Sequence, residues 1–325
     1  MNKLVAIHYS EYFQINHKEF ERLGVYDGFV NADSVLHIHP LLIRTTHIPE
    51  FCDAYQEFLL HFNNVQHLVR CQINGKAYDK CERALKSLLT FKELPNTGLG
   101  YSKGRTGTGI SGHLTNVLYQ SAREIIEAGI SDSNMFILLP LIEDQIGADR
   151  ISDMTISILR KRFYSYTARV AKELNISCAC YQEEQERYLL PMIERKPVVF
   201  MPCEFLQELP VAESLQDVSK VCKYNQELRN IICREISITF KEYDQYNKNK
   251  IKKIVLGNSQ LTQSLLNYLK TVTLKPYDFK KDEIGEYVFS RIDEQIWSKN
   301  LITLPLPTTE NVLDITIQIC QQYKT

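Results

Sequence analysis

The sequence predicts a mixed α/β (α+β) fold over residues 1–240 and a mainly helical region over residues 241–325. Two observations lead to this prediction. Short apolar runs at 135–142 and 197–202 have the length and composition of buried strands. Longer segments around them carry apolar residues every three or four positions, which is the spacing of helices. Because both patterns alternate along the chain, we expect helices packed against a small sheet layer.

The N-terminal part begins with short strands and continues with a helical hairpin. Residues 4–7 form a strand candidate, and residues 29–43 form an extended segment that Pro40 limits to a sheet edge or a strand end. Helical spacing then covers residues 49–69, and a second helix over residues 77–89 follows an Asn-Gly break. We expect this hairpin to pack on the N-terminal strands.

Residues 96–175 contain the two most unusual loops of the chain. We expect in order a glycine-rich loop, a helix, an apolar strand, an acidic segment and a long helix, over residues 98–112, 114–128, 135–142, 143–153 and 153–175. Binding and catalytic residues are found mostly on loops that rigid elements hold in place. The functional site is therefore expected where the two loops flank the strand.

The remaining sequence is dominated by helical spacing. A helix is expected over residues 215–236, after the buried strand at 197–202. Residues 241–253 are polar and form either an exposed helix or a linker. Further helices are expected over residues 261–269, 284–297 and 310–323.

The composition is that of an ordinary globular protein. The chain has 325 residues, 44% of them hydrophobic and 24% charged, with a net charge of −1, so the whole molecule is not built to bind polyanions. Its nine cysteines include no CxxC pair and are interpreted as reduced thiols of a cytoplasmic protein. The N-terminus lacks the features of a signal peptide, and no apolar run approaches the ~20 residues of a membrane span.

The glycine-rich loop is the first candidate site. Six glycines lie between Gly98 and Gly112, and they allow successive backbone N–H groups to surround an anion beside a helix N-terminus. The GxxxxGK[ST] pattern of a Walker A loop is absent. The alternatives are a mobile surface loop or a tight backbone crossing. The residues proposed to contact a phosphate or a nucleic-acid backbone are Gly100, Lys103, Gly104, Arg105, Gly107 and Gly109.

The acidic segment is the second candidate site. Glu143, Asp149 and Asp153 lie where a strand end meets a helix start, and carboxylates placed in this way can bind Mg²⁺ in a phosphodiester hydrolase. The structural alternative is that Asp149, Ser152 and Asp153 cap the helix while Arg150 pairs with a neighbouring acid. Both interpretations stay open, so the sequence establishes no cofactor and leaves open whether the protein is an enzyme.

Two further patterns have structural alternatives that are more common than a site. His37 and His39 lie on one face of the same extended segment, as some metal ligands do, but most strand histidines are partnered or exposed. The basic run at residues 248–253 is more typical of a solvated helix face than of a nucleic-acid contact.

Several stretches resemble the N-terminal region of a group of uncharacterised bacterial proteins. The likeness spans roughly residues 24–235 and is carried by residues 24–42, 98–110, 141–155 and 197–212, of which LIEDQIGADRISDMT (141–155) is the most specific. In these defence-type proteins the region precedes a restriction-endonuclease-like PD-(D/E)XK domain. This sequence has His39 where the group has an acid, and G-x-V-D-F followed by E-x-K-L is absent. We therefore expect the nuclease to be a separate polypeptide or to have been lost.

The resemblance implies an antiviral, defence-associated protein and supplies no catalytic residues. The leading hypothesis is a non-catalytic or regulatory subunit of an anti-phage complex, working with a nuclease or ATPase encoded nearby, and nucleic acid is a second candidate partner. Residues 241–325 would then dock the partner. The alternative is a metal-dependent nuclease or phosphohydrolase that uses Glu143, Asp149 and Asp153. A third hypothesis is a sensor whose glycine-rich loop binds a nucleotide.

Overall fold

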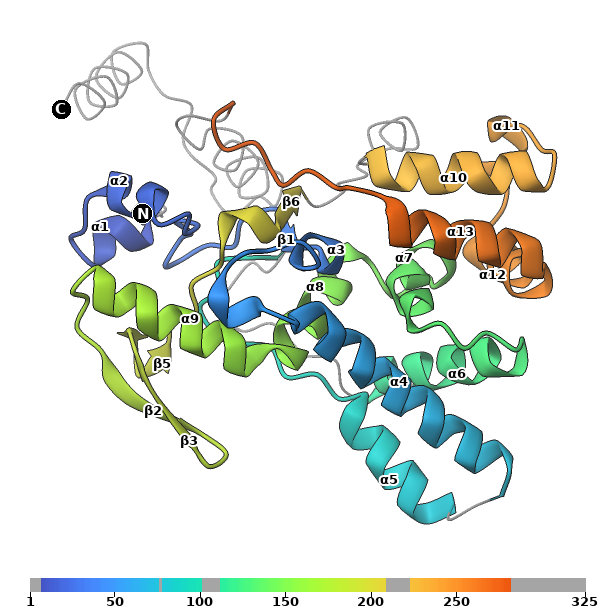
Figure 1. Ribbon diagram of the computed structural model, residues 1–325, viewed down its shortest axis with the longest axis horizontal. Helices are drawn as coiled ribbons and strands as arrows, with labels where there is room; N and C mark the ends of the chain where they lie inside the picture. Colours follow the sequence, from blue (N-terminus) through green and yellow to red (C-terminus); the bar gives the residue numbers. More distant parts are fainter. Residues whose placement is uncertain (1–6, 76–77, 101–111, 209–222, 282–325) are drawn as a thin grey trace, which may run out of the picture.

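The computed structural model describes residues 7–75, 78–100, 112–208 and 223–281. Within these ranges the fold is mixed, with many helices and three small antiparallel sheets, as the sequence predicted. Figure 1 shows the hairpin of residues 179–190 beside the helix of residues 160–173, and the helices of residues 223–271 on the other side of the molecule. None of the described helices combines the length and apolar composition needed to cross a membrane.

The first hydrophobic cluster is built around the N-terminal segment and the middle of the chain. Its sheet pairs β1 (Leu36–Ile38) with β6 (Leu206–Glu208) antiparallel, so that Leu36 lies opposite Glu208 and Ile38 opposite Leu206. Phe20, Phe163 and Phe200 are fully buried in this cluster. The elements that surround it are α1 (Tyr9–Tyr12), α2 (His17–Arg22), β1 (Leu36–Ile38), η1 (Pro49–Phe51), α9 (Arg160–Glu173), η3 (Cys203–Phe205) and β6 (Leu206–Glu208).

The second cluster is helical and joins distant parts of the chain. The predicted hairpin is present as α4 and α5, and α6 packs beside α4. The apolar face of α4 buries Phe58, Phe62 and Val65, as its spacing predicted. The other elements of the cluster reach to residue 271. The bounds are α3 (Pro40–Ile43), α4 (Ala54–Ile73), α5 (Tyr78–Leu88), α6 (His113–Glu127), α10 (Lys223–Glu235), α11 (Phe240–Tyr243), α12 (Lys248–Gly257) and α13 (Ser259–Thr271).

The predicted strand at residues 135–142 is wrong. The segment forms η2 (Ser133–Leu138) followed by α7 (Leu139–Ile142), and almost all of its side chains are buried. An unbroken apolar run has no period, so it fits a buried helix as well as a buried strand. Pro140 also suits the first turn of α7, where a backbone N–H has no partner within the helix.

Three other elements differ from the prediction. The long helix expected at 153–175 is two helices, α8 (Ala148–Ile158) and α9, which meet at Leu159 with φ −93° and ψ 14°. Of residues 197–202, only Pro197 belongs to a named strand. It is the last residue of β5 (Lys196–Pro197), which pairs with β4 (Met192–Ile193). A hairpin of β2 (Ala179–Glu183) and β3 (Glu186–Leu190) was not expected.

The segment at 241–253 is helical and part of the folded body. It forms α11 and α12, and Val255, Leu261 and Leu265 are fully buried against the cluster that contains α4 and α6. The domain boundary at residue 240 stays a prediction. The helices expected at 284–297 and 310–323 lie outside the described residues.

Candidate functional site

The start of the glycine-rich loop is fixed to Ser34. Ser34 N donates to Gly98 O at 2.9 Å, and Gly100 N donates to Ser34 O at 3.0 Å. The Ser34 hydroxyl adds a bond of 2.8 Å to Gly98 O. Of the proposed phosphate contacts, Gly100 is described with φ +127°. The others, Lys103, Gly104, Arg105, Gly107 and Gly109, lie outside the described residues, so their role stays a prediction.

Gly98 brings the loop into close contact with the N-terminal segment. A Cβ atom added there would lie 3.2 Å from the Tyr9 hydroxyl and 3.3 Å from Phe29 N, and the φ of +70° also favours glycine. The Tyr9 hydroxyl donates to Asn96 O at 2.7 Å. The loop therefore starts beside residues 8–29.

The structure brings three polar side chains of that segment together around Asp27. The Asp27 carboxylate is buried and accepts bonds from Ser10 N at 2.8 Å, Ser10 Oγ at 2.5 Å and His17 Nδ1 at 2.8 Å. His8 Nδ1 lies 2.9 Å from the backbone oxygen of Asp27 and 3.9 Å from Oδ2. We call Ser10, His8, His17 and Asp27 the Asp27 cluster.

The acceptors in the Asp27 cluster determine the tautomers of both rings. A carbonyl oxygen only accepts, so His8 Nδ1 must carry the proton that it shares with Asp27 O. The same argument applies to His17 Nδ1 and the Asp27 carboxylate oxygen that accepts from it. The hydrogen bond that His17 donates to Asp27 raises the pKa of His17, and partial burial opposes that rise. Sequence analysis missed this cluster because no short spacing connects its members.

Glu143 of the acidic segment forms an ion pair. Its carboxylate is buried, accepts a hydrogen bond from the Ser121 hydroxyl, and lies 2.5 Å from Lys252 Nζ. Lys252 also pairs with Glu124 of α6. Lys248 Nζ donates to the backbone oxygen of Glu143 at 2.8 Å. The acidic segment and the basic run were treated as separate sites, and the structure joins them.

Asp149 and Asp153 surround Arg150 on α8. Arg150 Nε lies 3.8 Å from Asp149, and its guanidinium donates to Asp153 at 3.3 Å. Burial and, next to it, the charge of Glu93 raise the pKa of Asp153 to about 7, although the charge of Arg150 lowers it. Across the part of the chain that the structure describes, no group of three or more His, Cys, Asp or Glu residues is placed to hold a metal ion.

The capping interpretation of these residues needs correction. Gly147 is the N-cap of α8, with no capping side chain, and Asp149 lies in the first turn. Ser152 and Asp153 lie inside the helix and cannot cap it. Ser152 Oγ instead accepts from Ile38 N at 2.9 Å, which ties α8 to β1.

His37 and His39 are core residues. Both are buried, with ring centroids 6.1 Å apart. Burial lowers the pKa of His37 to about 4 and lowers that of His39, which the neighbouring His37 lowers further. His39 Nδ1 accepts from Leu41 N and caps α3, which explains a polar side chain at this position.

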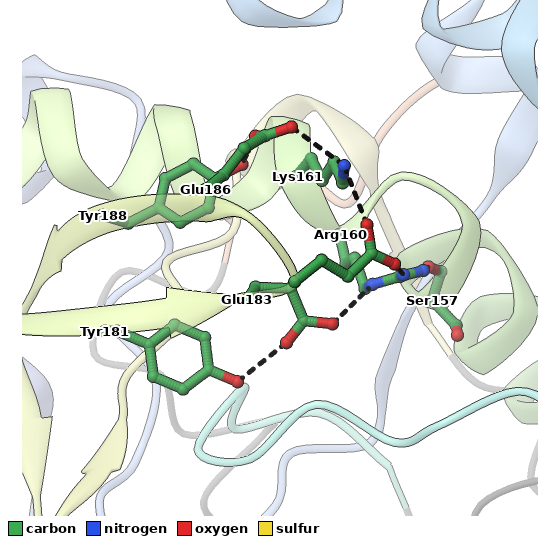
Figure 2. Close-up of polar contacts among 8 residues, drawn as sticks. Ser157, Arg160, Lys161, Tyr181, Glu183, Glu186 and Tyr188 are labelled. Atoms are coloured by element: carbon green, nitrogen blue, oxygen red, sulfur yellow. Dashed lines mark hydrogen bonds and ion pairs between the residues drawn. The ribbon is translucent and has the colours of Figure 1, made fainter.

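A charged network holds the unexpected hairpin on α9 (Figure 2). Arg160 donates to Glu183 at 3.0 Å and to Glu184 at 2.8 Å. Lys161 lies 3.1 Å from Glu184 and 2.9 Å from Glu186. Two cations at the start of α9 therefore bind three carboxylates at the turn of the hairpin.

Three tyrosines complete the contact between the hairpin and α9. Tyr181 and Tyr188 lie opposite each other in the strand register, and each ring centroid lies 5.3 Å from that of Tyr164. Figure 2 shows Tyr181 bonded to Glu183 on one strand and Tyr188 beside Glu186 on the other. The arrangement fixes the hairpin and leaves Leu189 exposed.

The comparisons with known proteins give one match. A family model described as "Domain of unknown function (DUF8370)" matches residues 14–213, which is more than half of the chain. The match includes His17, Asp27, the glycine-rich loop and the acidic segment, and it ends before α10. No curated protein and no solved structure matches the chain.

Proposed function

We propose, from the premise that the chain belongs to the DUF8370 family, that it is a non-catalytic or regulatory subunit of a bacterial anti-phage defence complex. In this proposal it works in the cytoplasm with a separate nuclease or ATPase. The support for defence is the resemblance of residues 24–235 to bacterial defence-type proteins. The family description itself carries no function.

The pairing of Glu143 is the observation that supports a non-catalytic role most directly. A carboxylate that binds Mg²⁺ must offer its oxygens to the ion. The Glu143 carboxylate instead binds Lys252 and Ser121, and Lys248 binds its backbone oxygen. Glu143 therefore joins α12 to α6 and α7, which is a structural role.

The partner is proposed to dock on the C-terminal region. Residues 248–271 belong to the folded body, because Leu261 and Leu269 are buried with the side chains of α4 and α6. Removing everything from residue 255 would therefore unfold the core, and its effect on a partner would not be informative. A chain ending at Lys281 keeps all of the described C-terminal helices. We propose that residues 282–325 carry the docking contacts.

The test is co-purification with the product of a neighbouring nuclease or ATPase gene. The tagged full chain should retain that product, and the chain ending at Lys281 should lose it while unfolding with the same cooperativity. The Leu189→Ser variant is the surface control, since Leu189 is exposed on the hairpin, and it should retain the partner. A folded chain ending at Lys281 that retains the partner would reject the docking proposal.

The second candidate function is a metal-dependent nuclease or phosphohydrolase. The observation that favours it is the proximity of Asp149 and Glu93 to Asp153, whose pKa is raised to about 7. Carboxyl groups with such pKa values are found at active sites as well as in structural networks. Mg²⁺ would be the cofactor, and a cleavage assay distinguishes the two functions.

A further inference from the structure

The exposed side of α4 carries a histidine and a cysteine one turn apart. His67 and Cys71 are four positions apart in the helix, so their side chains lie on the same face, one above the other. His67 is exposed, and Cys71 is a half-buried free thiol. The two side chains point toward each other, because Cys71 Sγ lies 3.7 Å from His67 Nε2.

This separation is close to that of two ligand atoms on one tetrahedral metal ion. Zn²⁺ binds thiolate sulfur at about 2.3 Å and imidazole nitrogen at about 2.0 Å, and tetrahedral geometry then places the two ligand atoms about 3.5 Å apart. A small movement of either side chain therefore lets Sγ and Nε2 bind the same ion. A thiolate with an imidazole is also a donor set for zinc rather than for Mg²⁺ or Ca²⁺, which prefer oxygen ligands.

One chain supplies half of such a site. A structural zinc site is closed by four ligands. Within the described ranges, no third His, Cys, Asp or Glu joins His67 and Cys71 in a group that could hold the ion. A second copy related by a two-fold axis would present the same two residues, so that two chains together supply two thiolates and two imidazoles.

The surface around the pair is suited to contact with a second copy. The helix stripe that contains the pair has no Asp, Glu, Lys or Arg between residues 56 and 74, and its residues are Gln56, Leu60, Asn64, His67, Cys71 and Asn74. Charged residues make up 24% of the chain, and they are depleted at the centre of interfaces. Leu60 is an apolar side chain that is 57% exposed on this stripe. The neighbours α5 and α6 pack against α4 and leave the stripe exposed (Figure 1).

We propose that His67 and Cys71 bind Zn²⁺ together with the same two residues of a second copy, so that the ion joins two chains through α4. Cys71 binds as the thiolate and releases its proton to solvent. The site goes beyond the proposed function, because it assigns a metal ion and a second copy to the chain. It does not depend on a defence role.

The test is the mass of the full chain in analytical ultracentrifugation, with EDTA or with added Zn²⁺, while a phosphine keeps the thiols reduced. The chain should be a monomer in EDTA and a dimer in zinc, with one ion for two chains. Co²⁺ in place of zinc should give a thiolate charge-transfer band and the strong visible bands of a tetrahedral site. A dimer that persists in EDTA, or a zinc-bound chain that stays a monomer, would contradict the bridging ion.

Two variants and a matched control separate the site from other thiols. His67→Gln and Cys71→Ser each remove two of the four ligands, and they should weaken zinc-dependent association about a hundredfold, since even the outer partners of metal ligands contribute on this scale. Both changes lie on the exposed side of α4, so urea unfolding should match that of the parent. Cys52→Ser is the control, because Cys52 is an exposed free thiol just before α4, and it should behave like the parent. Equal zinc-dependent association in the parent, His67→Gln and Cys71→Ser would overturn the proposal.

Discussion

Glu143 is the acidic residue whose surroundings the structure defines most completely. Its side chain is 10% exposed and that of Lys252 is 12% exposed, so the pair is shielded from solvent. Removing one partner of a shielded pair leaves the other charge without full compensation. Glu124 remains beside Lys252 and limits the loss.

We therefore expect Glu143→Gln to lower the free energy of unfolding by about 2 kcal/mol. Glu127→Gln is the control, because Glu127 pairs with Arg123 on the exposed face of α6, and such exposed pairs contribute little to stability. Urea unfolding followed by circular dichroism measures both changes. Equal stability of the Glu143→Gln variant and the parent protein would contradict the structural role of the pair.

Buried and half-buried histidines should make the protein less stable in mild acid. Burial lowers the pKa of His37 and of His61 to about 4, below the ~6.5 of an unfolded chain. As the pH falls below about 6.5, the unfolded state takes up protons that the folded state does not, so stability is lost towards pH 4. His17 has a raised pKa, and its contribution is instead lost as the pH rises.

The His61→Gln variant tests this expectation. His61 Nε2 lies 3.0 Å from Leu88 O, and a glutamine amide can donate to the same oxygen without titrating. The difference in free energy of unfolding between about pH 7 and about pH 5 should be smaller in the variant, by on the order of 1 kcal/mol. If the parent and the variant lose the same stability in urea titrations at both values, His61 does not titrate as the structure implies.

The residues of the site were only partly accessible to sequence analysis. The acidic segment was identified, but pattern alone could not show that Glu143 faces Lys252, because the two are distant in sequence. The Asp27 cluster was missed for the same reason, since His8, His17 and Asp27 follow no regular spacing. Ser152 and Asp153 were expected to be caps. The helix begins at Ala148, with Gly147 as its N-cap, so both residues lie inside it.

The β2–β3 hairpin depends on α9 for its position. Among the described strands it forms a sheet of only two, and such a hairpin is marginally stable without other packing. Arg160 binds Glu183, whose side chain is 17% exposed, whereas the partners of Lys161 are more than half exposed. Arg160 should therefore contribute more than Lys161 to holding the hairpin on α9.

We expect Arg160→Ala to increase hydrogen exchange at the amides of β2 and β3. Lys161→Ala should have a smaller effect, because exposed ion pairs contribute little. Hydrogen exchange followed by mass spectrometry measures both variants, with α4 as the internal reference. If Arg160→Ala leaves exchange in the hairpin unchanged, the tyrosine contacts alone hold it on α9.

Several elements with strong helical spacing were predicted well, although the helix expected at 153–175 is two helices. Helices α4, α5, α6 and α13 lie where their apolar stripes indicated. The run at 135–142 was assigned to the wrong structure because its residues are apolar on every side. The hairpin was missed because its strands expose many polar residues and its inner face is built from tyrosines that pair with glutamates.

For the molecule as a whole, the two hydrophobic clusters show which chain segments far apart in sequence pack together. The second cluster joins Leu41 near the N-terminus to Leu269 of α13. The helices α10 to α13 therefore pack in the same cluster as α4 and α6. The proposed role as a non-catalytic partner is therefore tested by the activity of the purified chain alone.

Cleavage of DNA and RNA by the isolated chain, in Mg²⁺ with and without EDTA, tests that role most directly. The parent protein, Asp149→Asn and Asp153→Asn would be compared at equal folded concentrations, together with phage protection in cells. Asp153→Asn should also be tolerated in stability, because burial and the charges of Glu93 and Asp149 oppose ionisation of this carboxyl. We expect no metal-dependent cleavage by any of the three proteins. Cleavage by the parent that EDTA abolishes and that both variants lose would contradict a non-catalytic role and establish a metal-dependent hydrolase instead.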